Sequence, residues 1–161
     1  MRSLRYVLSG ILLLLLMAAG CSSAGDTWPE YRNDTFPFSV KYPPGWVINK
    51  GKLVPPPPYT TSFQGDGAAI SITVWMDPTD GREAPGLSSD GWTFSAVKVG
   101  GEKASYAARP SAESKPGVWR QVYATHDGKG YEIGLLVHDP SRSVEAVSVF
   151  DRLLRSVRWV K

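Results

Sequence analysis

The chain has 161 residues, of which 42% are hydrophobic and 20% are charged. This length fits one domain, and this composition excludes a chain that is disordered throughout. The 18 Lys and Arg outnumber the 15 Asp and Glu, but two of the cations, Arg2 and Arg5, lie at the very start. Without those two, 16 scattered cations face 15 acids, so we predict no nucleic-acid partner.

The first twenty residues predict a secretory signal peptide. Arg2 and Arg5 precede a short apolar stretch, Val7 to Ala19, which ends in small residues. A membrane-spanning helix needs about 20 apolar residues, and this stretch is shorter. A charged start, a short apolar middle and a small-residue end are typical of a signal peptide. We therefore expect residues 1–20 to be removed.

The residues Ala18-Ala19-Gly20-Cys21 resemble the lipobox of bacterial lipoproteins, although that family prefers Leu where this chain has Ala18. The resemblance implies that Cys21 carries a diacylglyceryl group and becomes the new N-terminus. Cys21 is the only Cys, so it cannot form an internal disulfide. Two or more acyl chains anchor stably. We expect a membrane protein on the extracytoplasmic face, or in the outer membrane of a Gram-negative host; a soluble secreted protein is the alternative.

A small polar segment follows the cysteine, and strand patterns follow that segment. Residues 21–30 are interpreted as the lipidated Cys and a short tether, and residues 31–161 as one domain beginning near Trp28 or Tyr31. Apolar and polar residues alternate over several stretches, which predicts half-buried strands. These stretches are 38–42, 59–64, 68–76 and 94–99. The region 77–90 is rich in Gly, Pro, Ser and Asp and predicts a loop.

The sequence "VWRQVYATHDGKGYEIGLLVHD" predicts a hairpin around Asp127-Gly128-Lys129-Gly130. A turn centred on Gly128-Lys129 would place His126 opposite Tyr131. It would place His138 opposite Trp119, so the two His would lie more than about 20 Å apart at 3.4 Å per residue. We therefore predict no two-His metal site, and local Asp partners for each His instead.

The period changes near the C-terminus, where residues 143–156 predict a helix that Ser141 or Ser143 caps. Its expected apolar stripe comprises Val144, Val147, Phe150, Leu154 and Val157, with Leu153 at the edge. A short strand over 157–160 is expected to follow. Several strands and one firm helix predict an α+β domain, with an antiparallel sheet packed against the C-terminal helix.

Four segments in this order resemble the PsbP-like domain family. They are "FPFSVKYPPGW" from Phe36, "AISITVWM" from Ala69, "VKVGGEKA" from Val97 and "FDRLLRSVRW" from Phe150. The resemblance covers most of 36–161 and implies an α/β/α sandwich and an accessory role. It also implies that Trp46, after the Pro-Pro-Gly break, packs over the core. The family's first crossover helix would be short or missing here, because 77–90 is rich in Pro and Gly.

The chemistry-bearing residues indicate binding rather than catalysis. There is no Gly-x-Ser-x-Gly elbow, and neither Gly-rich turn opens a helix as a phosphate site requires. The acids of "DPTDGRE" do not have EF-hand spacing, so we predict no metal and no cofactor. The candidate contacts for a ligand or partner are Trp75 and Trp92, which could belong to an exposed aromatic patch, with Asp77 and Asp80.

Three functions remain open. We favour a membrane-anchored, non-catalytic accessory or binding lipoprotein with a possible protein partner at the membrane. The alternative is a cell-surface sensor of a small ligand or metal ion. A cell-envelope hydrolase is least supported, because it would need two carboxylates that face each other in a cleft.

Overall fold

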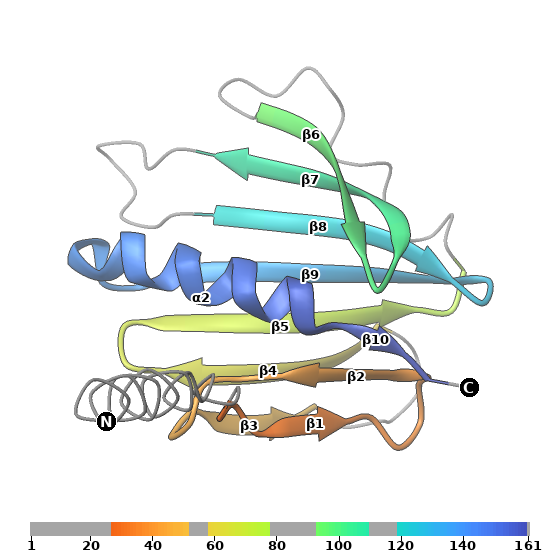
Figure 1. Cartoon of the computed structure of the whole chain (residues 1–161), viewed down its shortest axis with the longest axis horizontal. Helices are drawn as coiled ribbons and strands as arrows, with labels where there is room; N and C mark the ends of the chain where they lie inside the picture. Colours follow the sequence, from red (N-terminus) through yellow and green to blue (C-terminus); the bar gives the residue numbers. More distant parts are fainter. Residues whose placement is uncertain (1–26, 52–57, 78–92, 110–118, 161) are drawn as a thin grey trace, which may run out of the picture.

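The structure is a computed structural model, and it describes residues 27–51, 58–77, 93–109 and 119–160. Strands dominate the chain, and the single described α-helix comes near its end (Figure 1). The elements are β1 (Glu30–Arg32), β2 (Phe38–Lys41), β3 (Val47–Lys50), β4 (Tyr59–Gly65), β5 (Ala68–Trp75), β6 (Thr93–Val99), β7 (Glu102–Arg109), β8 (Trp119–His126), β9 (Lys129–Val137), the 3-10 turn η2 (Pro140–Arg142), α2 (Ser143–Ser156) and β10 (Arg158–Trp159).

The strands form two antiparallel sheets, and α2 lies across one face of the larger one (Figure 1). The large sheet has the order β3-β4-β5-β9-β8-β7-β6, and the small sheet has the order β1-β2-β10. Ring contacts between Tyr31 and Phe63 and between Phe38 and Tyr131 pack the small sheet onto the face that α2 covers. The predicted α+β class, an antiparallel sheet against a C-terminal helix, is confirmed. The expected loop beyond Asp77 lies outside the described residues.

The alternating strand β5, inside the large sheet, forms as predicted. In β5 the side chains of Ala68, Ile70, Ile72 and Val74 are all buried, while the residues between them are half-buried. Fully burying a Val or Ile side chain stabilises the fold by roughly 1.5–3 kcal/mol. The period of two in the sequence therefore reports directly which face of β5 meets the core.

The register of the β8–β9 hairpin differs from the predicted one by two residues. The turn is Asp127-Gly128, with φ of 47° and 68°. His126 therefore pairs with Lys129, and Leu136 takes the place opposite Trp119 that was predicted for His138. Two consecutive residues with positive φ make a two-residue turn whose twist matches that of the flanking strands, and Asp-Gly is a favoured pair for it.

The helix has the predicted bounds, and the predicted stripe residues Phe150, Leu153, Leu154 and Val157 are buried, but Ala146 is buried in place of Val144. Its buried residues are Ala146, Phe150, Leu153 and Leu154, whereas the side chain of Val144 is 84% exposed. The N-cap is Arg142, which makes no side-chain capping bond, so neither predicted Ser caps α2. Instead Asp139 caps the preceding 3-10 turn. Among the described residues, no helix has both the length and the apolar content needed to cross a bilayer.

Candidate functional site

The Pro-Pro-Gly break after β2 aims Trp46 at the end of the β4–β5 hairpin. The turn closes through the Trp46 N–H, which donates to the Pro43 carbonyl at 3.3 Å, and Gly45 has φ of 81°. The indole lies against the backbone of Gly65, where an added Cβ would come within 2.2 Å of the ring. Trp46 is half-buried and packs against the core, so its neighbours include both the core and the surface.

A hollow of about 350 Å³ lies beside Trp46. The β2–β3 turn, the β4–β5 turn and the first turns of α2 form its walls. The lining residues are Pro43, Pro44, Gly45, Trp46, Gly65, Asp66, Ala68, Arg142, Glu145, Ala146 and Val149. This volume is near the lower end of the range of small-molecule sites, and the walls combine apolar groups with a few charged ones, as such sites do.

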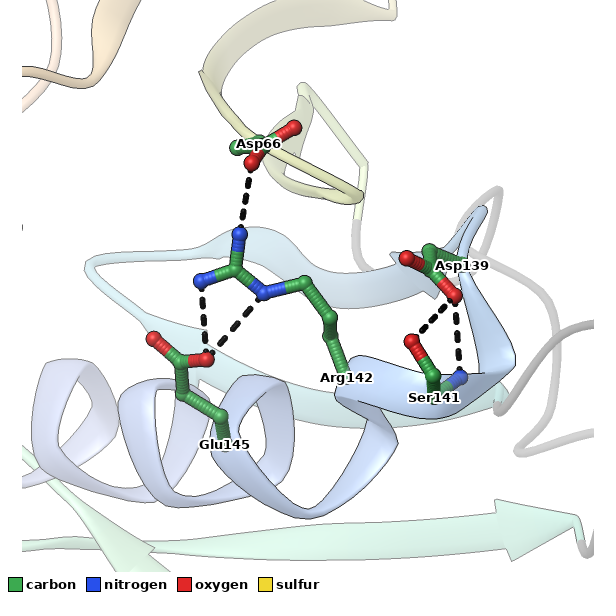
Figure 2. A network of polar contacts seen from close by, with 5 residues as sticks. All are labelled: Asp66, Asp139, Ser141, Arg142 and Glu145. Carbon is green, nitrogen blue, oxygen red and sulfur yellow. Dashed lines mark hydrogen bonds and ion pairs between the residues drawn. The ribbon is translucent and has the colours of Figure 1, made fainter.

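Arg142 links two walls of the hollow (Figure 2). Its Nη1 donates to Asp66, in the β4–β5 turn, at 2.6 Å. Its Nε and Nη2 donate to the same oxygen of Glu145 at 3.1 and 2.8 Å. The hydrogen bond from Arg142 to Glu145 raises the pKa of the guanidinium, and the charges of Glu145, Asp66 and Asp139 add to this effect. Arg142 is therefore charged at neutral pH.

Asp139 forms the other half of this network (Figure 2). It accepts hydrogen bonds from the Ser141 hydroxyl at 2.7 Å and from the Ser141 N–H at 2.9 Å. The hydroxyl bond lowers the pKa of Asp139 most, followed by the backbone bond. The pKa of Asp139 is lowered and that of Arg142 is raised, so both lie farther from neutral pH. General acid–base catalysis needs a pKa close to the working pH. Neither Asp139 nor Arg142 is therefore suited to proton transfer near neutral pH.

The charged side chains at this hollow contribute little to the stability of the fold, and their main effect is on the charge of the site. The side chains of Asp66 and Glu145 are 93% and 62% exposed. Exposed ion pairs contribute about 0–1 kcal/mol each. The two acids leave a net negative charge beside the indole of Trp46, an arrangement that complements a cationic or amine-bearing group with an apolar stem.

The residues predicted as ligand contacts lie away from this hollow or outside the described part. Trp75 ends β5 and is half-buried, and its indole N–H finds no acceptor among the described residues. Asp77, two residues later, is exposed and has an interaction partner. Asp80 and Trp92 lie outside the described residues. Within the described ranges, no three His, Cys, Asp or Glu side chains gather closely enough to hold a metal ion.

The two His residues lie at opposite ends of the β8–β9 hairpin, and the partner predicted for His126 is wrong. Its Nδ1 lies 2.7 Å from Oε1 of Glu102, the first residue of β7. The predicted partner was the following residue, Asp127. The imidazole stacks on Trp159 with ring centres 4.5 Å apart and planes 9° apart. Gly100, with φ of 57°, leaves room for Trp159, because a Cβ there would lie 2.5 Å from the indole nitrogen. These contacts fix the C-terminal strand.

No protein-family model matches the sequence, and no curated protein matches it either. Among solved structures, the chain is similar to the solution structure of a cyanobacterial PsbP protein, CyanoP, from Synechocystis sp. PCC 6803. The TM-score is 0.59 at 15% identity, and the match covers 86% of this chain and 96% of that chain. The chain has a PsbP-like fold. At this identity the likeness concerns the fold alone.

The sequence singled out Trp46 of this PsbP-like fold as a core residue but gave no sign of the hollow beside it. Arg142 and Asp66 are 76 positions apart in the sequence, and no local pattern connects them. The available signal was the Asp-Gly pair at Asp66, which marks a β4–β5 turn. It locates the turn but not the helix that packs beside it.

Replacing Trp46 tests its packing role in the PsbP-like fold. We expect Trp46→Ala to destabilise the domain by about 2 kcal/mol, less than the roughly 3–5 kcal/mol for a fully buried aromatic, because half-burial leaves less area to lose. Gly65→Ala should cost about 1–3 kcal/mol, because the new methyl displaces the indole. Urea unfolding of both variants measures these free energies.

The double variant supplies the control for this prediction. With Ala at position 46, the Gly65→Ala change should cost nothing or stabilise by up to about 1 kcal/mol, since Gly65 lies in a strand without positive φ. Equal costs for Gly65→Ala in both backgrounds would contradict the contact between the indole and Gly65.

Buried Tyr131 makes the free energy of unfolding of this PsbP-like fold decrease at alkaline pH. Its side chain is 2% exposed and its hydroxyl has no partner among the described residues. Burial, with smaller contributions from the charges of Asp127 and Glu102, raises the pKa of Tyr131 to about 12. The native state thus favours the neutral phenol. The stability this provides is complete below the unfolded-state pKa near 10 and is lost as pH rises through about 12.

We expect Tyr131→Phe to remove this alkaline loss. At pH 7 the variant should be as stable as the wild type or more stable, because the unpaired buried hydroxyl is gone. Between pH 10 and pH 12 the wild type should lose about 2–3 kcal/mol relative to the variant. Denaturant unfolding at pH 7, 10 and 11.5 measures this difference. Parallel pH curves for the two proteins would rule it out.

Proposed function

We propose that the protein is a membrane-anchored extracytoplasmic lipoprotein whose PsbP-like domain is a non-catalytic accessory or binding module. The observation that carries the proposal is the lone Cys21, placed directly after a signal-like leader and six residues before the first described residue. A single Cys in an exported chain has no internal disulfide partner, and lipidation gives it a role. A solved structure with a similar fold is a cyanobacterial PsbP protein.

The chemistry of the described residues supports binding rather than turnover. The hollow beside Trp46 contains two exposed carboxylates held by Arg142, and the nearby Asp139 and Arg142 have pKa values shifted away from neutrality. Its small volume suits a side chain of a protein partner or a small ligand. We propose a protein partner at the membrane, because a tether holds the hollow close to other membrane proteins.

The cell-surface sensor remains the second candidate, and the same hollow favours it. An aromatic wall with acids on its rim suits a small amine-bearing ligand. For the described residues, the structure offers this candidate no metal cluster. A small ligand would act alone at the hollow, whereas a protein partner would cover the surface around it.

Fatty-acid labelling tests the anchor. We expect cells that express the full chain with an alkyne-bearing palmitate to label the wild-type protein, because Cys21 supplies the thioether and the amine that carry the acyl chains. Cys21→Ser should lose the label completely, and the neighbouring Ser23→Ala should keep it. In-gel fluorescence reads the label. Label that persists in Cys21→Ser, or none in the wild type, would refute the anchor.

Photo-crosslinking from the hollow tests the partner. Val149 lines the hollow on α2, and Lys98 is exposed on β6 outside it. We expect Val149→p-benzoyl-phenylalanine in intact cells to give a light-dependent adduct with a membrane protein, and the same replacement of Lys98 to give none. Adding Trp46→Ala should weaken the adduct several-fold, because it removes one wall. Identical adducts from both positions would argue against the hollow.

A further inference from the structure

A second hollow, of about 360 Å³, lies at the opposite end of α2 from the one beside Trp46. The end of β2, the last turn of α2 and the start of β10 surround it, and Glu30 of β1 lies on its rim. Four of its six lining residues are cations. We call Lys41, Arg152, Arg155 and Arg158 the basic face; Glu30 and Ser156 complete the lining.

Ordered contacts hold the basic face in place. The Arg152 guanidinium lies over the Trp28 ring at 4.1 Å, a cation–π contact. Arg158 Nη1 donates to the carbonyls of Arg155 and Val157 at 3.0 and 2.8 Å, at the end of α2. The Ser156 hydroxyl joins the helix to the Lys41 backbone, accepting from its N–H at 2.9 Å. The cations are therefore presented by a fixed framework.

The basic face concentrates the positive charge of the mature chain. Four cations and the single acid Glu30 give it a net charge of +3. The chain after residue 20 has 16 cations and 15 acids, which is a net charge of only +1. Everything outside the basic face therefore has a net charge of −2. Such a separation of charge is a device for orienting a protein toward an anionic surface.

The start of the described chain lies at this same place. Trp28 stacks under Arg152, and the Pro29 carbonyl accepts from the Tyr42 N–H at 3.0 Å, next to Lys41. Cys21 is six residues before Thr27, and six extended residues span at most about 20 Å. An anchor at Cys21, which the proposed function supplies, would therefore keep the basic face within about 20 Å of the bilayer.

We propose that the basic face docks the domain onto anionic phospholipid headgroups of the membrane that holds its anchor. Arginine guanidinium groups bind phosphate through paired hydrogen bonds. Each basic residue near an anionic bilayer contributes about a fivefold preference. A net of three charges therefore favours the docked orientation on the order of a hundredfold over a neutral bilayer. This inference rests on the anchor at Cys21 but goes beyond it, because it fixes an orientation.

The test uses the full lipidated chain in vesicles of phosphatidylcholine alone or with about one third phosphatidylglycerol. Phenylglyoxal modifies exposed Arg side chains, and mass spectrometry gives the rate at Arg152, Arg155 and Arg158. We expect these rates to fall about tenfold or more in the anionic vesicles and to recover in 0.5 M NaCl, which shortens the screening length. Acetylation of Lys98 and Lys103, an exposed pair opposite each other on β6 and β7, should not change.

Paired variants separate the basic face from general charge. Arg152→Gln with Arg155→Gln should reduce the protection of Arg158 about tenfold, whereas Lys98→Gln with Lys103→Gln, which removes the same charge, should leave it intact. Arg158 itself is kept because it binds the end of α2. Circular dichroism of each variant checks the fold. Equal protection in both double variants would overturn the proposal.

Three further results separate membrane docking from loss of the anchor and from binding of a free anion. Equal modification rates in the two kinds of vesicle, with the protein floating on both, would refute docking and leave the anchor standing. Failure to float on the neutral vesicles would refute the anchor. Protection of the same Arg side chains by inorganic phosphate in detergent, without vesicles, would identify a site for a free anion and overturn membrane docking.

Discussion

The four-residue strand β2 is the element on which the rest of the structure depends. It pairs with β1 on one side and β10 on the other, so it ties the start of the described chain to its end. Phe38, Ser39 and Val40 are all buried, and therefore both faces of the strand are covered. A strand covered on both faces cannot shift its register without moving apolar groups into water.

Because β2 is fixed, it also fixes the positions of the segments that follow it or pack against it. The Pro-Pro-Gly break that follows places the Trp46 ring against Gly65. The ring then forms one wall of the hollow. The Ser156 hydroxyl bonds to both the N–H and the carbonyl of Lys41, so the end of α2 is fastened to the end of β2. One strand thus places both an aromatic wall and part of the basic face.

The sequence was most informative where a short period reports burial. The alternation in β5 and the helical spacing of 143–156 each depend on one element meeting one core, and both are as predicted. The strands over 38–42 and 157–160 formed as predicted, whereas β1, β3 and β7 were not predicted. In β7, Ala and Ser stand where a strand pattern needs larger apolar residues. Trp46 packs against the core as predicted. That it also lines a hollow depends on the helix α2 beside it, which the local sequence does not reveal.

The errors concern residues whose partners are far apart in sequence. Asp127 was the predicted partner of His126, yet the observed partner is Glu102, 24 positions earlier, because β7 pairs with β8 in a register that brings Glu102 beside His126. Val144 fits a helical stripe as well as Ala146 does, and only the packing partner decides between them. Periodicity identifies an element; the contact between elements determines which of its residues can act.

The two surfaces on α2 constrain each other. The helix has 14 residues and is therefore about 20 Å long. The hollow beside Trp46 is at its first turns and the basic face at its last. If the basic face rests on headgroups, the hollow cannot lie farther than about one helix length from them. A partner that reaches it must then be a membrane protein or a segment close to the bilayer, so the orientation of the domain selects the class of partner before any side chain recognises it.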